Sequence, residues 1–74
     1  MNLKINQNQY DSLCSFIYNL GIGAFNGSTL LKKIKLNPND KTIRVEFMRW
    51  INNDGLEVRG LIRRRKAEAD LYFS

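Results

Sequence analysis

The chain has 74 residues, 43% of them hydrophobic and 26% charged, and its 12 Lys and Arg against 7 Asp and Glu give a formal net charge of +5. This length allows one small domain near the lower limit for an unaided core, and the composition is that of a folded chain. Cys14 is the single cysteine and histidine does not occur, which excludes an intramolecular disulfide and a histidine-based zinc site or catalytic triad. We therefore expect no metal and no cofactor. The positive charge favours an anionic partner, such as nucleic acid, an acidic cell-wall polymer or an anionic membrane surface.

The first predicted helix covers residues 7–20. Asn6 can cap it, Gln9 can complete a capping box three residues later, and Ile5 can pack against Tyr10 as a hydrophobic staple. Gly21 is placed to end the helix in the left-handed conformation. Helical spacing assigns an inner side to Tyr10, Leu13, Cys14, Ile17 and Leu20.

The stretch "GIGAFNGS", residues 21–28, is predicted to be a structural turn. It has three glycines, and no Lys-Ser or Lys-Thr follows as a phosphate-binding loop requires. Ser28 can then cap a short helix over "TLLKKIKL", residues 29–36, with Leu30, Leu31 and Ile34 inward.

The turn at "NPND" introduces a third helix, predicted from near Asp40 to near Asn52. Its apolar face consists of Ile43, Phe47, Trp50 and Ile51, widened by Val45 and Met48.

A turn at Asp54-Gly55 with a brief extended piece precedes a last helix from Leu61. The inner side of that helix is predicted to contain Leu61, Ala67 or the methylene stem of Arg64, Leu71 and Tyr72.

These elements predict one all-α domain over residues 1–74, a small bundle of about four short helices with short connections. The amino-terminal residues lack the apolar core of a signal peptide, and apolar residues never run long enough to span a bilayer. We expect a chain without a membrane span that is synthesised in the cytoplasm.

The order of the motifs closely resembles the carboxy-terminal helical lobe of phage-type lysozymes, glycoside hydrolase family 24. The segments that carry the resemblance are Gln9-Tyr10-Asp11, Asn19-Leu20-Gly21, Ser28 to Leu31, Phe47 to Trp50, Gly60-Leu61, Arg64-Arg65 and Glu68. They cover the chain from about residue 8 to its end. Arg59 and Arg63 depart from the pattern, where Pro and Asn are frequent in relatives.

The resemblance implies cleavage of the bond between N-acetylmuramic acid and N-acetylglucosamine in peptidoglycan, in a cleft between two lobes. In that family the catalytic Glu, Asp and Thr precede the region matched here, so we expect the amino-terminal catalytic lobe to be absent and assign no catalytic residue. Motif position implies sugar contacts for Tyr18 and Asn19. It also implies that Arg64, with Arg65 as second choice, faces the catalytic Glu.

The carboxylates of the second half of the chain do not suggest a catalytic pair. Glycoside hydrolysis needs two facing carboxyls, one of them protonated in an apolar setting. The candidates are Glu46, Asp54, Glu57, Glu68 and Asp70. They are predicted to be solvated, and nearby cations are expected to keep them ionised. For Glu68 one such cation is Arg64, one helical turn away.

The favoured hypothesis is a lysozyme-related module that is inactive alone, binds peptidoglycan weakly, and pairs with a missing catalytic lobe or with a second copy as a homodimer. One alternative is a small basic nucleic-acid-binding protein using Arg59 and residues 63–66. Consecutive helical residues point about 100° apart, however, so the four cations at 63–66 cannot share one face. Nucleic acid is therefore the less favoured partner. A phage structural or regulatory protein that binds another protein is the other alternative.

Overall fold

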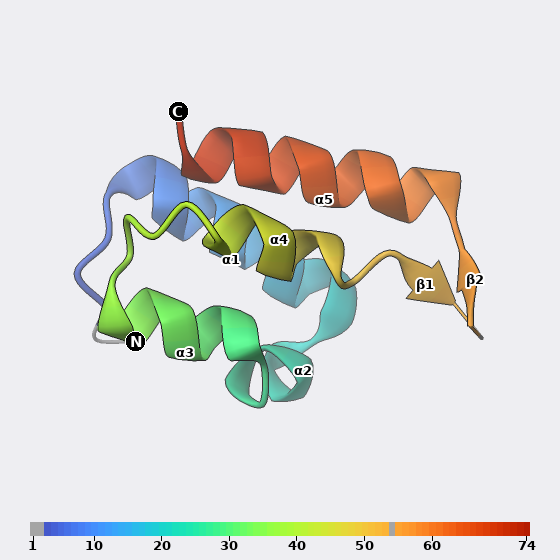
Figure 1. Ribbon diagram of the computed structural model, residues 1–74, viewed down its shortest axis with the longest axis horizontal. Helices are drawn as coiled ribbons and strands as arrows, with labels where there is room; N and C mark the ends of the chain where they lie inside the picture. The colour runs from blue at the N-terminus through green and yellow to red at the C-terminus, as the bar shows by residue number, and fades with distance from the viewer. Residues whose placement is uncertain (1–2, 54) are drawn as a thin grey trace.

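The computed structural model describes residues 3–53 and 55–74, which form five helices and one small hairpin (Figure 1). The elements are α1 Gln7–Leu20, α2 Ile22–Asn26, α3 Thr29–Leu36, α4 Ile43–Met48, β1 Asn52–Asn53, β2 Leu56–Glu57 and α5 Arg59–Tyr72. The prediction of a small, mostly helical domain is confirmed. No helix within the described ranges is long and apolar enough to cross a membrane.

Helices α1 and α5 form the main packing pair and run in opposite directions (Figure 1). Asn8 at the start of α1 donates to Ser74 beyond the end of α5, with a distance of 2.9 Å between Nδ2 and Oγ. Asn19 at the other end of α1 contacts Arg65, in the middle of α5. Helices α3 and α4 complete the bundle, with the short α2 connecting α1 to α3.

The start of α1 is the predicted capping box. The side-chain oxygen of Asn6 accepts from the backbone N–H of Gln9 at 2.8 Å, and the backbone N–H of Asn6 donates to Gln9 Oε1 at 2.9 Å. Gly21 ends the helix at φ 95° and ψ 154°, an extended rather than left-handed helical conformation that glycine alone adopts readily. Its backbone N–H still donates to the carbonyl of Ile17, at 2.7 Å.

The glycine-rich stretch contains the one-turn helix α2, so the prediction of a plain turn is wrong there. Phe25 is only 1% exposed, and its burial accounts for the extra helical turn, since the sequence alone disfavours one with so many glycines. Ser28 then caps α3 as predicted, accepting from the backbone N–H of Leu31 at 3.1 Å.

The core is built around Phe16, which lies edge-on to three aromatic rings. Its ring centroid is 6.0 Å from that of Phe25, 6.0 Å from that of Phe47 and 5.6 Å from that of Trp50. The predicted inner face of α1 is therefore rotated: Tyr10 is 48% exposed and Cys14 is exposed as well. The buried apolar side chains are Leu13, Phe16, Phe25, Leu30, Leu31, Ile34, Ile43, Phe47, Ala69 and Tyr72.

Helix α4 is shorter than predicted, and Val45 does not widen its buried face, because its side chain is 54% exposed. Trp50 and Ile51 follow the helix in irregular backbone and are half-buried. The hairpin that comes next pairs Asn52 with Glu57 and Asn53 with Leu56. The predicted turn residue Asp54 lies outside the described residues.

The inner face of α5 also differs from the prediction. Arg65, Glu68, Ala69 and Tyr72 are buried, whereas Ala67 and Arg64 are exposed and Leu71 is 37% exposed. Two oppositely charged side chains thus occupy positions where the hydrophobic pattern predicted solvent.

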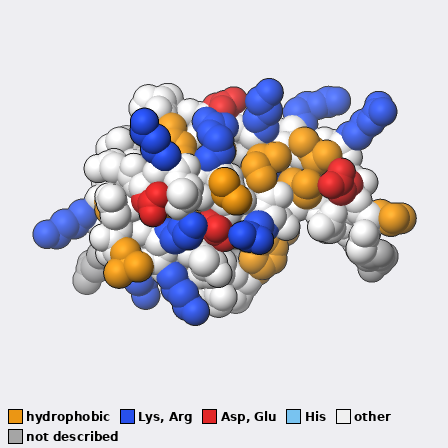
Figure 2. Space-filling model, in the orientation of Figure 1, with side chains coloured by type: hydrophobic (Ala, Val, Ile, Leu, Met, Phe, Trp, Pro, Cys, Tyr) orange, Lys and Arg blue, Asp and Glu red, His pale blue; other side chains and the backbone are white. Residues whose placement is uncertain are grey.

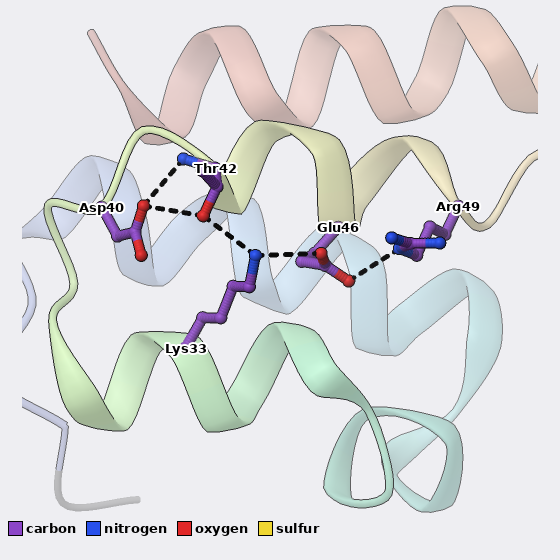
Figure 3. Close-up of polar contacts among 5 residues, drawn as sticks. All are labelled: Lys33, Asp40, Thr42, Glu46 and Arg49. Carbon is purple, nitrogen blue, oxygen red and sulfur yellow. Dashed lines mark hydrogen bonds and ion pairs between the residues drawn. The ribbon is translucent and has the colours of Figure 1, made fainter.

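Polar contacts anchor α4 to α3 (Figure 3). Glu46 is 4% exposed and binds two cations: its Oε2 lies 3.1 Å from Lys33 Nζ, and its Oε1 accepts from Arg49 Nε at 2.9 Å. Lys33 also donates to Thr42 Oγ1 at 2.9 Å. Two hydrogen bonds from Thr42, one from its hydroxyl and one from its backbone N–H, lower the pKa of Asp40.

Candidate functional site

The candidate site lies where the end of α1 meets the middle of α5, and its central residue is Arg65. This side chain is 0% exposed. Its Nη2 donates to Asn19 Oδ1 at 2.5 Å, and its guanidinium carbon lies 5.1 Å from the ring centroid of Phe16, in the geometry of a cation–π contact. Arg65 therefore connects the aromatic core to a polar residue at the surface.

Glu68 is the counter-ion of Arg65. It is 3% exposed, its Oε1 is 3.2 Å from Arg65 Nε, and its Oε2 accepts from Ser15 Oγ at 2.5 Å. Among the described residues Glu68 pairs with Arg65, three residues before it, and not with Arg64, one helical turn away. The polar chain runs from Ser15 on α1 through both α5 residues and returns to α1 at Asn19.

Three atoms of this cluster have no hydrogen-bond partner within the described part of the chain: Arg65 Nε, Arg65 Nη1 and Glu68 Oε1. Arg65 Nε and Glu68 Oε1 attract each other as an ion pair without the alignment of a hydrogen bond. Buried polar groups are nearly always satisfied in stable cores. These three atoms therefore set the cluster apart from the rest of the core.

Burial shifts the pKa of both ions toward their neutral forms. Desolvation lowers the pKa of Arg65, and the charge of Glu68 partly offsets this effect. Desolvation likewise raises the pKa of Glu68, opposed by the hydrogen bond from Ser15 and by the charge of Arg65. The expectation that no carboxyl has a raised pKa is therefore wrong for Glu68. The expectation of solvated carboxylates is wrong for both Glu46 and Glu68.

The four residues assigned to substrate contact lie in three settings. Asn19 and Arg65 touch each other, and Tyr18, next to Asn19, is 89% exposed. Arg64 is exposed on another face of α5, where it lines a shallow groove. The structure thus brings together two of the four.

The cations at positions 63–66 do not form a single basic surface. Arg65 points into the core, whereas Arg63, Arg64 and Lys66 are exposed. In Figure 2, Lys and Arg side chains occur along the upper edge and across the middle of the visible face, with Asp and Glu between them. A surface on α5 that binds a nucleic-acid backbone could not use Arg65, because that side chain is buried.

Ser15 and Glu68 were missed as members of the site. The signal was present in the spacing, because Leu61, Arg65, Glu68 and Tyr72 recur at intervals of three and four residues and so share one helix face. Reading charged residues as solvent-facing concealed that face. Groups of His, Cys, Asp or Glu that could hold a metal ion do not occur among residues 3–53 and 55–74.

Comparison with known proteins matches a family model described as phage lysozyme to residues 1–68. The chain is 43% identical over 79 residues to an endolysin of Acyrthosiphon pisum secondary endosymbiont phage 1, covering 100% of this chain and 53% of that protein. It is 39% identical over 74 residues to the endolysin of Salmonella phage P22, with 100% and 49% coverage. With the endolysin of Bacillus phage B103 it shares 35% identity over 74 residues, with 100% and 28% coverage. The chain thus spans about half, or less, of the length of these relatives.

Proposed function

Because the chain belongs to the phage lysozyme family, we propose that it is the carboxy-terminal helical lobe of a peptidoglycan muramidase and forms one wall of the glycan-binding cleft. Its site of action is the bacterial cell wall. The opposite wall, with the catalytic carboxyls, comes from a second lobe.

The contact between Arg65 and Asn19 is the observation that best supports this proposal. Arg65 is fully buried, and its bond to Asn19 Oδ1 fixes the orientation of the amide. The amide NH₂ is then free to donate to an acceptor outside the protein. A carbonyl of an N-acetyl group on the glycan is such an acceptor.

Tyr18 supplies the apolar part of the same contact. Its ring is 89% exposed, so little of its area is used for folding. An exposed aromatic ring beside a fixed amide donor suits a sugar, which presents both a C–H face and polar substituents.

We propose that the chain alone does not hydrolyse glycan. Among residues 3–53 and 55–74 the buried carboxylates are Glu46, which pairs with two cations, and Glu68, which pairs with one. Glu68 has a raised pKa, but its oxygens face Ser15 and Arg65 rather than a second carboxyl across a substrate cleft.

Binding to purified peptidoglycan sacculi tests the glycan contact. The chain should sediment with sacculi, and Tyr18→Ala should weaken binding by roughly tenfold, which corresponds to about 1.4 kcal/mol. Tyr10→Ala is the matched control, because Tyr10 is a partly exposed tyrosine on the same helix, two turns away. Equal loss in both variants, or binding unaffected by Tyr18→Ala, would show that this end of α1 does not contact glycan.

A turbidity assay on bacterial cell walls tests the absence of catalysis. The isolated chain should leave the optical density unchanged under conditions where a full-length endolysin clears the suspension. Robust clearing by the 74-residue chain would overturn the assignment of catalysis to a second lobe.

A further inference from the structure

Four side chains form a polar network across the contact between α1 and α5. Ser15 and Asn19 lie four residues apart on α1 and share one face of that helix. Arg65 and Glu68 lie three residues apart on α5 and share a face as well. Because the two helices run in opposite directions (Figure 1), Ser15 meets Glu68 and Asn19 meets Arg65. The network therefore connects a buried carboxylate to an exposed amide through a fully buried guanidinium.

The position of Arg65 depends on its counter-ion. Glu68 Oε1 lies 3.2 Å from Arg65 Nε, and Glu68 Oε2 accepts from the hydroxyl of Ser15. The guanidinium is planar, so attraction at Nε also sets the direction of Nη2, the nitrogen that donates to Asn19 Oδ1. The orientation of the Asn19 amide thus depends on the charge of Glu68, two contacts away.

A proton on Glu68 removes this attraction. If the proton is bound at Oε1, an O–H group faces the N–H group of Arg65 Nε, and two donors oppose each other. If it is bound at Oε2, Ser15 must accept instead of donate, and the negative charge is lost all the same. The guanidinium stays charged without a counter-ion, which favours turning its polar end toward water. That movement breaks the bond to Asn19 Oδ1, and the exposed amide can then rotate.

The fold accommodates the neutral form of Glu68. Burial raises the pKa of this carboxyl, against the hydrogen bond from Ser15 and the charges of Arg65 and Arg64. The folded chain therefore binds the proton more tightly than the unfolded chain does, so protonation does not require unfolding. Within α1 and α4, which pack against α5 and are described throughout, the other charged or titratable side chains do not contribute to this shift. They are Tyr10, Asp11, Cys14, Tyr18, Arg44 and Glu46.

We propose that Ser15 and Glu68 are positioning residues for the glycan contact at Asn19, and that protonation of Glu68 weakens this contact. The ionised carboxylate keeps Arg65 on Asn19 Oδ1, so the amide NH₂ stays directed outward. The neutral carboxyl releases it. The inference rests on the proposed function, because it adds regulation by pH to the same Asn19 donor. Glycan binding is therefore stronger above the pKa of Glu68 than below it.

NMR spectroscopy of the chain alone tests the network without any glycan. The side-chain NH₂ resonances of Asn19 should titrate together with the carboxyl carbon of Glu68, at a midpoint above the ordinary pKa of a glutamate. The NH₂ group of Asn8 is the internal control, since it donates to Ser74 at the other end of α1, and it should not follow this titration. Ser15→Ala removes a hydrogen bond that favours the ionised carboxylate, so it should move both midpoints to higher pH.

Binding to purified peptidoglycan sacculi tests the effect on the glycan contact with a matched pair of variants. Glu68→Gln removes the charge inside the network, and Asp70→Asn makes the same change two residues away, at an exposed carboxylate paired with Arg44. At pH 7 Glu68→Gln should bind roughly fivefold more weakly than the wild type, as for the loss of one hydrogen bond. This ratio should approach one in acid, whereas Asp70→Asn should match the wild type at every pH. Comparing proteins at the same pH cancels the titration of the sacculi themselves.

Three outcomes overturn the inference. They are Asn19 resonances that stay constant while Glu68 titrates, a ratio of wild-type to Glu68→Gln affinity that does not change with pH, and equal weakening by Glu68→Gln and Asp70→Asn. If Glu68→Gln does not fold, the NMR titrations of the wild type and of Ser15→Ala still test the network.

The two measurements also separate this inference from the proposed function. A wild-type chain that does not bind sacculi refutes the glycan contact, while the Asn19 titration still shows whether the network responds to pH. Constant Asn19 resonances, together with sacculi binding that is lost on Tyr18→Ala, refute the network and leave the glycan contact standing.

Discussion

The buried pair of Arg65 and Glu68 makes a stability prediction that differs for its two members. Glu68→Leu leaves a fully buried guanidinium without its counter-ion, and an arginine side chain keeps its proton throughout the pH range in which proteins fold. Breaking a buried pair in this way costs about 3–5 kcal/mol. A chain of 74 residues has a total stability of only about 4–11 kcal/mol, at about 0.05–0.15 kcal/mol per residue. Glu68→Leu should therefore leave the domain close to unfolding.

Arg65→Met leaves the Glu68 carboxyl without its counter-ion, but this group can become neutral by binding a proton. Protonating a carboxyl of ordinary pKa, about 4.3, costs about 3.7 kcal/mol at pH 7 and about 1 kcal/mol at pH 5, at 1.36 kcal/mol per unit. These values limit the electrostatic cost of an isolated Glu68. The sign follows from its raised pKa: the native state binds the proton more tightly than the unfolded chain, so stability falls as pH rises through the pKa of Glu68.

Urea unfolding followed by circular dichroism at pH 7 and pH 5 separates the two variants. Arg65→Met should regain up to about 2.7 kcal/mol relative to the wild type on going to pH 5, whereas Glu68→Leu should regain almost nothing. The double variant Arg65→Met/Glu68→Leu should be near the wild type or up to a few kcal/mol more stable, because apolar replacement of a buried pair removes the desolvation cost. The reasoning is refuted if both single variants respond equally to pH, or if the double variant loses the sum of their costs.

Three further predictions concern the fold. Gly21→Ala should lower the free energy of unfolding in urea by about 1–3 kcal/mol, because φ 95° and ψ 154° strain any residue that has a side chain. Gly23→Ala should leave that free energy unchanged or raise it by up to about 1 kcal/mol, because Gly23 lies in α2 with open space around it. Equal effects at the two positions would contradict this reasoning. Phe16→Ala should lower the free energy of unfolding by about 3–5 kcal/mol, because it removes a buried aromatic ring. Tyr10→Ala, at a partly exposed position, should lower it by less than about 1 kcal/mol. The reverse order would show that α1 buries its other face. Burial raises the pKa of Tyr72 to about 12, so its contribution to folding stability is complete below pH 10 and is lost as pH rises toward 12. The Tyr72→Phe variant should lack this pH-dependent loss of stability in alkaline unfolding. It also loses the 2.6 Å hydrogen bond to the Pro38 carbonyl.

Local signals in the sequence identified the helix boundaries well wherever a single side chain sets them. Asn6 with Gln9, and Ser28 before α3, act through hydrogen bonds that span three residues, so the chain needs no tertiary contact to specify them. The inward faces of the predicted helices were less accurate. On α1 both Tyr10 and Phe16 fit a helical repeat, and only packing against the rings of Phe25, Phe47 and Trp50 selects Phe16.

The substrate contacts assigned to Tyr18, Asn19, Arg64 and Arg65 rest on a resemblance in motif order. Sequence order places Tyr18 beside Asn19, and it leaves Arg64 and Arg65 as alternatives. The fold separates these two: Arg64 lines the groove on α5, whereas Arg65 is buried against Asn19. Helical geometry turns adjacent residues by about 100°, and only the position of α1 determines which of them faces it.

The sequence by itself determined the family, the helical class, the helix caps and the absence of histidine chemistry, because all of these depend on residue type and short spacing. The tertiary structure decided that Arg65 and Glu68 are core residues. A charged side chain is normally assigned to solvent, since burying it alone costs several kcal/mol. That cost is offset here by groups from another helix, Ser15 and Asn19, which lie 53 and 46 residues away in the chain. Only the packing of α1 against α5 brings them together.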